Sequence, residues 1–326
     1  MKISCWAALL ALTMQITPAS ANEAALSAQV TKADGWVAYR VPIVADIGEP
    51  CCFLDASDQR SGCDLDERNW RVGMNSKVAA APGNELAVHL RVKSGRIEQV
   101  RAFAATCPIR NASAIRWIDA VDPAHSVALL GAHVDRQDDR RNDDALAALA
   151  MHAHDAALRA LGDRAEPGRE RSTREQALFW LGQTRGVAGA EIVTRHARGD
   201  ADPKLREHAV FVLSQTTAVD GYARIHAIAR EDDAEQVRGQ ALFWMAQMND
   251  ALAAQDILDA LRDDRSEHVR EQAVFALSQL GDGKGDAALI ALVRGDHPRA
   301  VKQRALFWLG QSGSPQALEL FDDALR

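Results

Sequence analysis

The stretch Arg174-Glu-Gln-Ala-Leu-Phe-Trp-Leu-Gly-Gln183 decides the fold, because the chain repeats it with small changes. The further copies are Arg206-Glu-His-Ala-Val-Phe-Val-Leu-Ser-Gln215, Arg238-Gly-Gln-Ala-Leu-Phe-Trp-Met-Ala-Gln247, Arg270-Glu-Gln-Ala-Val-Phe-Ala-Leu-Ser-Gln279 and Lys302-Gln-Arg-Ala-Leu-Phe-Trp-Leu-Gly-Gln311. The interval from the start of one copy to the start of the next is the same throughout. A fixed period of roughly 20–50 residues indicates units that bury their apolar faces against their neighbours.

Shorter helical patterns separate the copies, for example Ile225, Ile228 and Ala229. Each unit is therefore predicted to be two helices joined by a turn rich in Gly and Asp. One block further back, Asn142 to Met151 keeps the Ala-Leu-x-x-Leu spacing but lacks Phe and Gln, as a terminal capping repeat would. With a last helix over 315–326, residues 122–326 are predicted to form an α-α superhelix, a solenoid of about six repeats.

An aspartate precedes the leading base of four units by six residues, in the pairs Asp200/Arg206, Asp232/Arg238, Asp264/Arg270 and Asp296/Lys302. With this feature, residues 122–326 resemble HEAT repeats of the short, phycobilisome-lyase-like type. The resemblance implies that these Asp and Arg side chains bond between neighbouring repeats as a ladder. The first full repeat departs from the pattern, with Gly168 in the place of the Asp. Such scaffolds carry many unrelated activities, so the resemblance indicates the architecture and not the function.

The first residues have the features of an export signal. Met1-Lys2 is followed by a short apolar run, Cys5 to Leu12, and by the small-residue site Ala19-Ser20-Ala21. We expect residues 1–21 to be a signal peptide, cleaved after Ala21. The run is too short for a transmembrane helix, which needs roughly 20 apolar residues. The mature chain is therefore expected to be periplasmic or secreted, without insertion into the membrane.

Residues 22–121 follow a different pattern from the repeats. Trp36 to Val41 and Leu86 to Val92 are predicted to be strands, and the second alternates apolar and polar residues as a half-buried strand does. Lys93-Ser94-Gly95 is predicted to turn it into a third strand, Arg96 to Phe103. We expect a small β-rich domain at the front end of the solenoid.

Cys51, Cys52, Cys63 and Cys107 all lie in this segment. An even, clustered set in an exported chain favours disulfides. Cys51 and Cys52 are neighbours and pair poorly with each other, so Cys63 and Cys107 are each expected to take one of them. Zinc is the alternative, but the usual paired spacing of two to four residues between cysteines is absent.

The repeated phenylalanines and glutamines are the candidate partner-binding residues. At about 100° per residue, Phe179 and Gln183 fall nearly opposite the core stripe formed by Ala177, Leu178 and Leu181. Stacked units would align them in two rows: Phe179, Phe211, Phe243, Phe275 and Phe307, with Gln183, Gln215, Gln247, Gln279 and Gln311. The rows favour a groove for an extended peptide, because rings can hold side chains and amides can bond to a peptide backbone. The alternatives are that the rings cover one another or that the N-terminal domain covers them.

The alternating tryptophans, Trp180, Trp244 and Trp308, are expected to pack between repeats. They stand beside small residues, Gly182, Ala246 and Gly310, which are predicted to make room for the indoles.

The function predicted from these patterns is a non-catalytic scaffold that binds a protein or peptide. The net charge of −7 argues against nucleic acid as the partner. The alternative is an oxidoreductase resembling deoxyhypusine hydroxylase, a HEAT-repeat enzyme with iron bound by repeated His-Glu pairs. Here the pairs Glu207-His208 and Glu267-His268 have the reverse order and unmatched repeat positions, so we expect no metal site, cofactor or catalytic residues.

Overall fold

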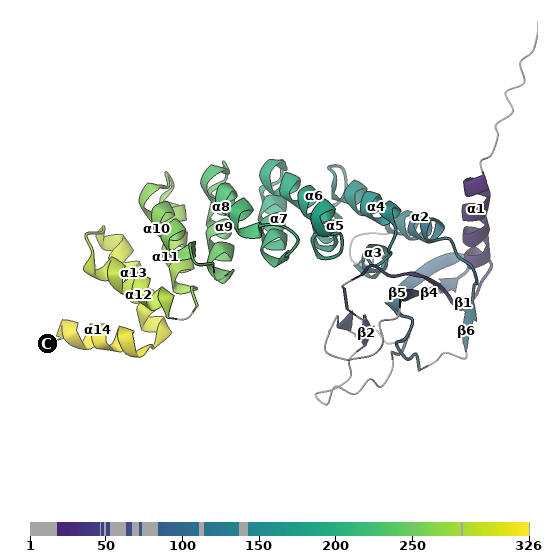
Figure 1. Ribbon diagram of the computed structural model, residues 1–326, viewed down its shortest axis with the longest axis horizontal. Coiled ribbons are helices and arrows are strands. Elements are labelled where there is room, and N and C mark those ends of the chain that lie inside the picture. The colour runs from purple at the N-terminus through teal and green to yellow at the C-terminus, as the bar shows by residue number, and fades with distance from the viewer. Residues whose placement is uncertain are drawn as a thin grey trace, which may run out of the picture.

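The computed structural model describes residues 18–45, 47–48, 50–52, 63–66, 72–73, 84–110, 114–136, 143–248, 250–281 and 283–325. A small sheet lies at one end of a long helical array (Figure 1). The expected fold class, a HEAT-like solenoid preceded by a β-rich unit with a disulfide, is confirmed. Residues 1–17 lie outside the described residues, so the signal peptide stays a prediction.

The main sheet has the order β5-β4-β1-β6. Its strands are β1 (Gly35–Pro42), β4 (Glu85–Lys93), β5 (Arg96–Ala104) and β6 (Ile115–Trp117). The predicted hairpin between β4 and β5 is confirmed, and Ser94 and Gly95 turn the chain with φ of 49° and 74°. Strands β2 (Cys51–Cys52) and β3 (Val72–Gly73) form a second, two-stranded sheet.

Helix α1 (Pro18–Thr31) was not predicted, because its first residues fall in the segment interpreted as a leader. Leu26 and Val30 of this helix are buried. They belong to a hydrophobic cluster that continues without a break to Leu320 near the C-terminus. The β-rich segment and the solenoid therefore share one core.

The solenoid begins with α2 (Pro123–Val134), α3 (Asp143–Ala150) and α4 (Asp155–Ala165). The repeated blocks form the inner helices α5 (Arg171–Thr184), α7 (Pro203–Gln215), α9 (Glu235–Gln247), α11 (Glu267–Ser278) and α13 (Arg299–Ser312). The outer helices are α6 (Gly186–Gly199), α8 (Gly221–Glu231), α10 (Ala253–Asp263) and α12 (Lys284–Arg294), and α14 (Pro315–Leu325) ends the array. The inner helices α5, α7, α9 and α11 pack closely in succession, whereas the outer helices stand further apart, so the inner side is the concave one.

Turn residues fix where the helices begin. Asp202 accepts a hydrogen bond from the backbone N–H of Lys204 at 3.0 Å, and Pro203 follows it at the first helical position. Asp220 caps α8 in the same way through Ala223. Aspartate side chains satisfy backbone donors that a helix start leaves unpaired, and proline lacks the donor altogether.

Three rungs of the ladder implied by the resemblance are present. The guanidinium of Arg206 donates to both carboxylate oxygens of Asp232, at 2.7 and 2.8 Å. Arg238 binds Asp264 in the same way at 2.8 and 2.9 Å, and Arg174 pairs with Asp200. Each rung joins one inner helix to the turn that precedes the next, so the rungs fix the stacking of successive units.

Hydrogen bonds join the sheet to the solenoid. The backbone N–H of Val44, just beyond β1, donates to Met151 O at 2.8 Å, and that of Ala153 donates to Pro42 O at 2.9 Å. Arg185, between α5 and α6, donates to Ala150 O and His152 O at 2.7 and 2.8 Å. The sheet is therefore held against the first repeat by backbone contacts on both sides of the α3–α4 turn. Among the described residues, no helix has the length and apolar character needed to cross a membrane.

Candidate functional site

The predicted Phe and Gln rows lie along the inner helices, as the repeat requires. Four of the rings, in Phe179, Phe211, Phe243 and Phe275, are half-buried, and Phe307 is 57% exposed. Of the glutamines, Gln183 and Gln279 are half-buried, and Gln215, Gln247 and Gln311 are exposed. The rows therefore present ring edges and amides on the inner face rather than fully open rings.

Aromatic contacts connect one repeat to the next along this face. Trp244 lies between Phe211 and Phe243, with ring centroids 5.0 Å apart in both pairs. Phe243 stacks on Phe275 at 5.8 Å and 7°, and Phe275 contacts Trp308 at 4.9 Å. Offset and edge-on contacts of this kind stabilise aromatic pairs. The alternative that the rings cover one another thus accounts for the buried parts of Phe243 and Phe275.

The part of each ring that is not buried is open to solvent or to a partner. Phe179 and Phe211 also pack on the main core, whereas Phe243 and Phe275 pack mainly on other aromatic rings. The described strands of the N-terminal segment lie at the α2–α5 end of the array, away from α9 and α11 (Figure 1). The described sheet therefore does not cover the middle of the rows.

Trp244 and Trp308 contact phenylalanines of the preceding repeats, as expected, but the explanation for the small neighbours Gly182 and Gly310 was wrong. A Cβ on Gly182 would lie 2.3 Å from Cγ1 of Val212 in the next repeat, so this glycine makes room for a valine. A Cβ on Gly310 would meet nothing within 4 Å. Gly182 therefore admits the branched side chain of Val212, and neither glycine makes room for an indole.

The polar side chains beside the rows are mostly engaged with their neighbours. His208 bonds through Nε2 to the backbone oxygen of Glu175 at 2.8 Å, and burial lowers the pKa of this imidazole. Glu207 accepts from Lys204 at 2.9 Å, and Glu271 pairs with Arg304 at 2.7 Å. The inner face therefore offers mainly neutral amides and aromatic edges, which suit a partner that presents backbone groups.

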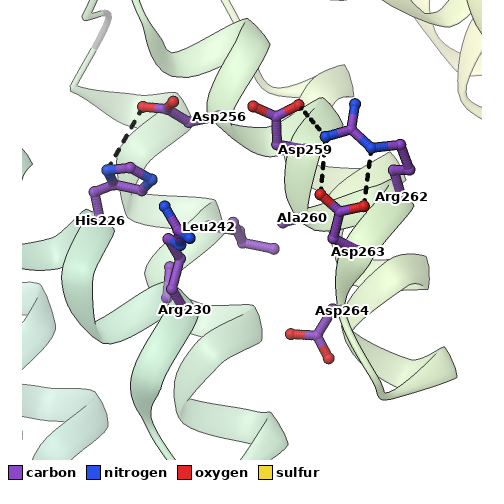
Figure 2. Close-up of a pocket in the computed structure, with 10 residues that line it drawn as sticks. His226, Arg230, Leu242, Asp256, Asp259, Ala260, Arg262, Asp263 and Asp264 are labelled. Atoms are coloured by element: carbon purple, nitrogen blue, oxygen red, sulfur yellow. Dashed lines mark hydrogen bonds and ion pairs between the residues drawn. The ribbon is translucent and has the colours of Figure 1, made fainter.

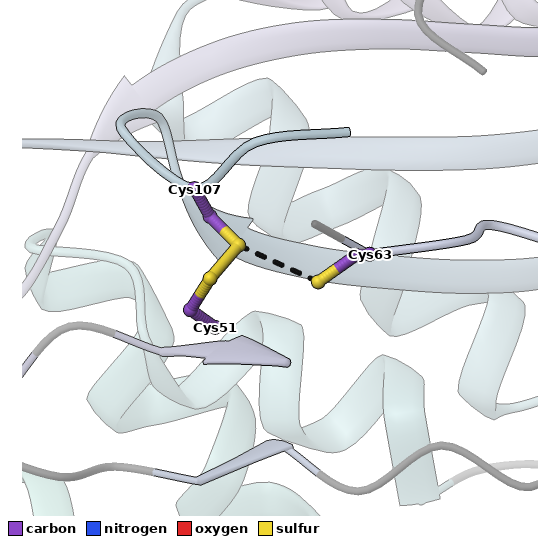
Figure 3. Close-up of side chains that lie close together, drawn as sticks. All are labelled: Cys51, Cys63 and Cys107. Carbon is purple, nitrogen blue, oxygen red and sulfur yellow. Dashed lines mark hydrogen bonds between the residues drawn. A yellow bond between two sulfur atoms is a disulfide. The ribbon is translucent and has the colours of Figure 1, made fainter. Parts of the chain in front are cut away.

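The side chains of Cys51, Cys63 and Cys107 form a compact group (Figure 3), which packs in a small hydrophobic cluster with Trp36 and Phe103. Cys51 and Cys107 form a disulfide with Cα atoms 5.5 Å apart, which is one of the two pairings left open by the sequence. Cys63 is also disulfide-bonded, and its sulfur lies 3.4 Å from that of Cys107. Cys52 remains its predicted partner, but the side chain of Cys52 lies outside the described residues.

These three described sulfurs lie within 4.8 Å of one another, close enough for a metal site. Zinc binds thiolates, and a sulfur in a disulfide carries no thiolate charge. The disulfide between Cys51 and Cys107 therefore joins β2 covalently to the turn that follows β5.

A buried polar chain that the sequence did not reveal joins β1, α2 and the α3–α4 turn. The Ser126 hydroxyl lies 2.8 Å from that of Tyr39 and 2.7 Å from Nε2 of His152. His152 Nδ1 donates to Ala148 O at 2.7 Å, so Nε2 is the acceptor and the ring is neutral. Burial lowers the pKa of His152 to about 4.

Serine and histidine at hydrogen-bond distance resemble a nucleophile and its base. Here Ser126 and His152 are both fully buried, and the tyrosine occupies the remaining side of the serine. No substrate can reach the hydroxyl in this state, so the chain of bonds fixes the junction between sheet and solenoid. Only tertiary structure brings these three residues together, and no local motif marks them.

The Glu-His pairs of the alternative oxidoreductase do not converge. His208 is bonded to a backbone oxygen, and His268 is exposed nearly two repeats further along. Within the described residues, the cysteines form the sole group of three or more metal-ligating side chains. The two Glu-His pairs therefore do not lie together in one site.

Comparisons with known proteins give a match to a repeat family and low-scoring likenesses to solved structures. A family model for HEAT repeats matches residues 222–306. A structure of human deoxyhypusine hydroxylase in complex with glycerol is 14% identical, covers 57% of this chain and 84% of that chain, and has a TM-score of 0.30. The complex of CpcE and CpcF of phycocyanin lyase from Nostoc is 20% identical and has a TM-score of 0.29. The likeness covers 63% of this chain and 84% of that chain. No curated protein sequence matches the chain.

Proposed function

We propose that this protein is a non-catalytic scaffold in the periplasm, which binds an extended segment of a partner protein along its inner face. The observation that carries the proposal is the double row of aromatic edges and amides on consecutive inner helices. A repeated scaffold needs only apolar contacts toward its core, whereas Phe243 and Phe275 pack mainly on other aromatic rings.

The middle of the row is the best candidate for the contact. Phe243 and Phe275 stack on each other and stay half-buried, so their outer edges can pack against a partner side chain. Gln247 and Gln279 lie one helical turn further on, where an amide can both donate to and accept from a peptide backbone. Aromatic anchors with adaptable polar neighbours are common at the energetic centre of interfaces.

The periplasmic location is proposed on the signal-like residues 1–21 and is supported by the disulfide between Cys51 and Cys107. Disulfides persist in oxidising compartments and are rare in the cytosol. Cell fractionation of a bacterial expression host, with N-terminal sequencing of the purified chain, tests this location. A mature chain that still begins at Met1 and stays in the cytosol would refute it.

The binding proposal is tested with the double variant Phe243→Ser/Phe275→Ser. Peptides are first selected on the wild-type protein from a random-peptide display library, and their affinity is then measured by fluorescence anisotropy. Since each interface anchor can carry about 2 kcal/mol or more, we expect at least a tenfold loss of affinity.

A matched control removes apolar surface elsewhere. Val187 and Leu252 are 58% and 62% exposed at the starts of outer helices, so Val187→Ser/Leu252→Ser should leave peptide affinity unchanged. Thermal melts on the same proteins separate binding from folding. The core variant Leu213→Ala is expected to lose about 2–5 kcal/mol, and the Phe double variant should lose less. Equal affinity of the wild type and the Phe double variant would refute the proposed face.

A further inference from the structure

A cleft of about 440 Å³ separates the outer helices α8 and α10 (Figure 2). Its floor consists of Ala229, Leu242 and Ala260. Arg230 lines it on α8, and Asp263 lies opposite on α10. The two walls therefore carry opposite charges across an open space.

The cleft exists because one repeat position holds a smaller residue than in the neighbouring outer helices. Ala260 occupies the position that Ile228 holds in the preceding unit and Leu292 in the following one. Both of those side chains are buried, at 3% and 2% exposure, and fill the space between their units. Alanine has no atoms beyond Cβ, so the corresponding volume between α8 and α10 is left unfilled.

The same interface lacks an ion pair that its neighbour has. Arg198 on α6 pairs with Glu231 on α8 at 3.3 Å, and Arg224 further joins these helices through Glu191 at 2.7 Å. Arg230 and Asp263 occupy the positions of Arg198 and Glu231 one repeat later. Asp263 instead pairs with Arg262 of its own helix at 2.8 Å.

Arg230 is consequently exposed and makes no ion pair with any residue in the described part of the chain. It is nevertheless close enough to act on Asp263. The pKa of Asp263 is lowered chiefly by its hydrogen bond to Arg262, with a smaller contribution from the charge of Arg230.

The inner side of this interface can serve as a pivot. Helices α9 and α11 pack closely there, and Phe243 lies flat on Phe275 at 5.8 Å and 7°. At the position of Trp244 and Trp308, α11 has Ala276. No indole therefore wedges these two helices, and parallel rings can slide past each other with little steric hindrance.

We propose that the α8–α10 interface is a hinge of the solenoid, open in the present structure and closed when Arg230 pairs with Asp263. Closure removes the unfilled space above Ala260 and reduces the curvature of the array at its middle. Oppositely charged walls attract one another, and this attraction weakens as salt screens it. The hinge does not depend on the identity of a partner. Its consequence for peptide binding, a change in spacing between the units that carry Phe243 and Phe275, rests on the proposed function.

Distances between paired nitroxide labels, measured by double electron–electron resonance, test the hinge. Ala223, Gln255 and Ala287 occupy one exposed repeat position on α8, α10 and α12. Labels at 223 and 255 span the cleft, and labels at 255 and 287 span the next interface as a control. We expect two distance populations for the first pair at low salt and one for the control pair. In about 1 M NaCl, where the Debye length is about 3 Å, the shorter population should disappear.

Two variants examine the cause of closure independently. Arg230→Glu replaces attraction by repulsion, and Ala260→Leu fills the space that closure has to remove. Both should leave only the longer distance between positions 223 and 255. A matched variant, Ala291→Leu on the exposed side of α12, should leave both populations in place. One narrow distance in the wild type, unaffected by salt, would overturn the hinge, and so would two populations that persist in both variants. Since no peptide is present, these outcomes are independent of the binding test.

Discussion

Removal of Arg238 tests whether the ladder stabilises the solenoid. The side chain is 2% exposed, and its guanidinium donates to both oxygens of Asp264 at 2.8 and 2.9 Å and to Asp232 O at 2.8 Å. In Arg238→Ala the carboxylate of Asp264 keeps its bond from Ser266 N–H but loses its cation. Breaking a buried pair by removing one partner costs about 3–5 kcal/mol, because the remaining charge is buried and uncompensated.

The expected loss in the free energy of unfolding is therefore about 3–5 kcal/mol, measured by urea denaturation followed by circular dichroism. Arg195→Ala is the matched control, since Arg195 pairs with Glu166 at 2.5 Å but is 62% exposed. An exposed pair contributes about 0–1 kcal/mol. Equal losses of unfolding free energy in the two variants would show that burial does not determine how strongly these ion pairs stabilise the fold.

Three further outcomes are expected. Burial lowers the pKa values of His89, His133 and His152 from 6.5 to about 4. In the folded state these rings stay neutral, whereas in the unfolded state they bind a proton below the ordinary histidine pKa of about 6.5. The free energy of unfolding should therefore fall as the pH is lowered from 6.5 to 4, by up to about 3 kcal/mol per ring. His89→Phe should weaken this dependence, because it removes one of the rings that take up a proton on unfolding. A pH profile of the melting temperature with an unchanged slope would contradict this. Gly182→Ala should lower the free energy of unfolding by about 1–3 kcal/mol, because the new methyl group clashes with Val212. Gly310→Ala at the same repeat position should leave it unchanged or raise it by up to about 1 kcal/mol. Equal melting temperatures for these two variants would refute this account of the glycine. Peptide mapping without reduction should recover Cys51 linked to Cys107. The double variant Cys51→Ser/Cys107→Ser should lose about 2–4 kcal/mol of stability. A free thiol at either cysteine in the wild type would contradict the bond.

Much of the architecture could be predicted from the sequence because the relevant signals are local or strictly periodic. The constant interval between the repeated blocks placed every inner helix, and alternation from Leu86 to Val92 placed a strand within one residue of its observed bounds. The turn at Ser94-Gly95 could also be predicted from the sequence, because it depends on two adjacent residues. Helix α1 was missed, because the small-residue site at Ala19 to Ala21 was interpreted only as a cleavage signal.

The candidate site was predictable in its residues but not in its exposure. A single helix places Phe243 opposite its own core stripe, and this much follows from the sequence. Whether the ring is then covered depends on the next repeat, where Phe275 happens to stack on it. The same holds for Gly182, whose neighbour Val212 belongs to the following repeat and is invisible to any local pattern.

The sequence by itself determined the repeat, the helix faces and the clustering of the cysteines, because each depends on spacing along one chain. The ladder was implied only by the resemblance to HEAT repeats. Tertiary structure decided which half of each ring is buried, which cysteines pair, and how Tyr39, Ser126 and His152 meet. It also decided that Ala260 opens a cleft, since an unfilled space arises only where two units are packed against each other. The physical reason is that burial and electrostatic pairing depend on distances between segments, and those distances are set by the curvature of the whole array.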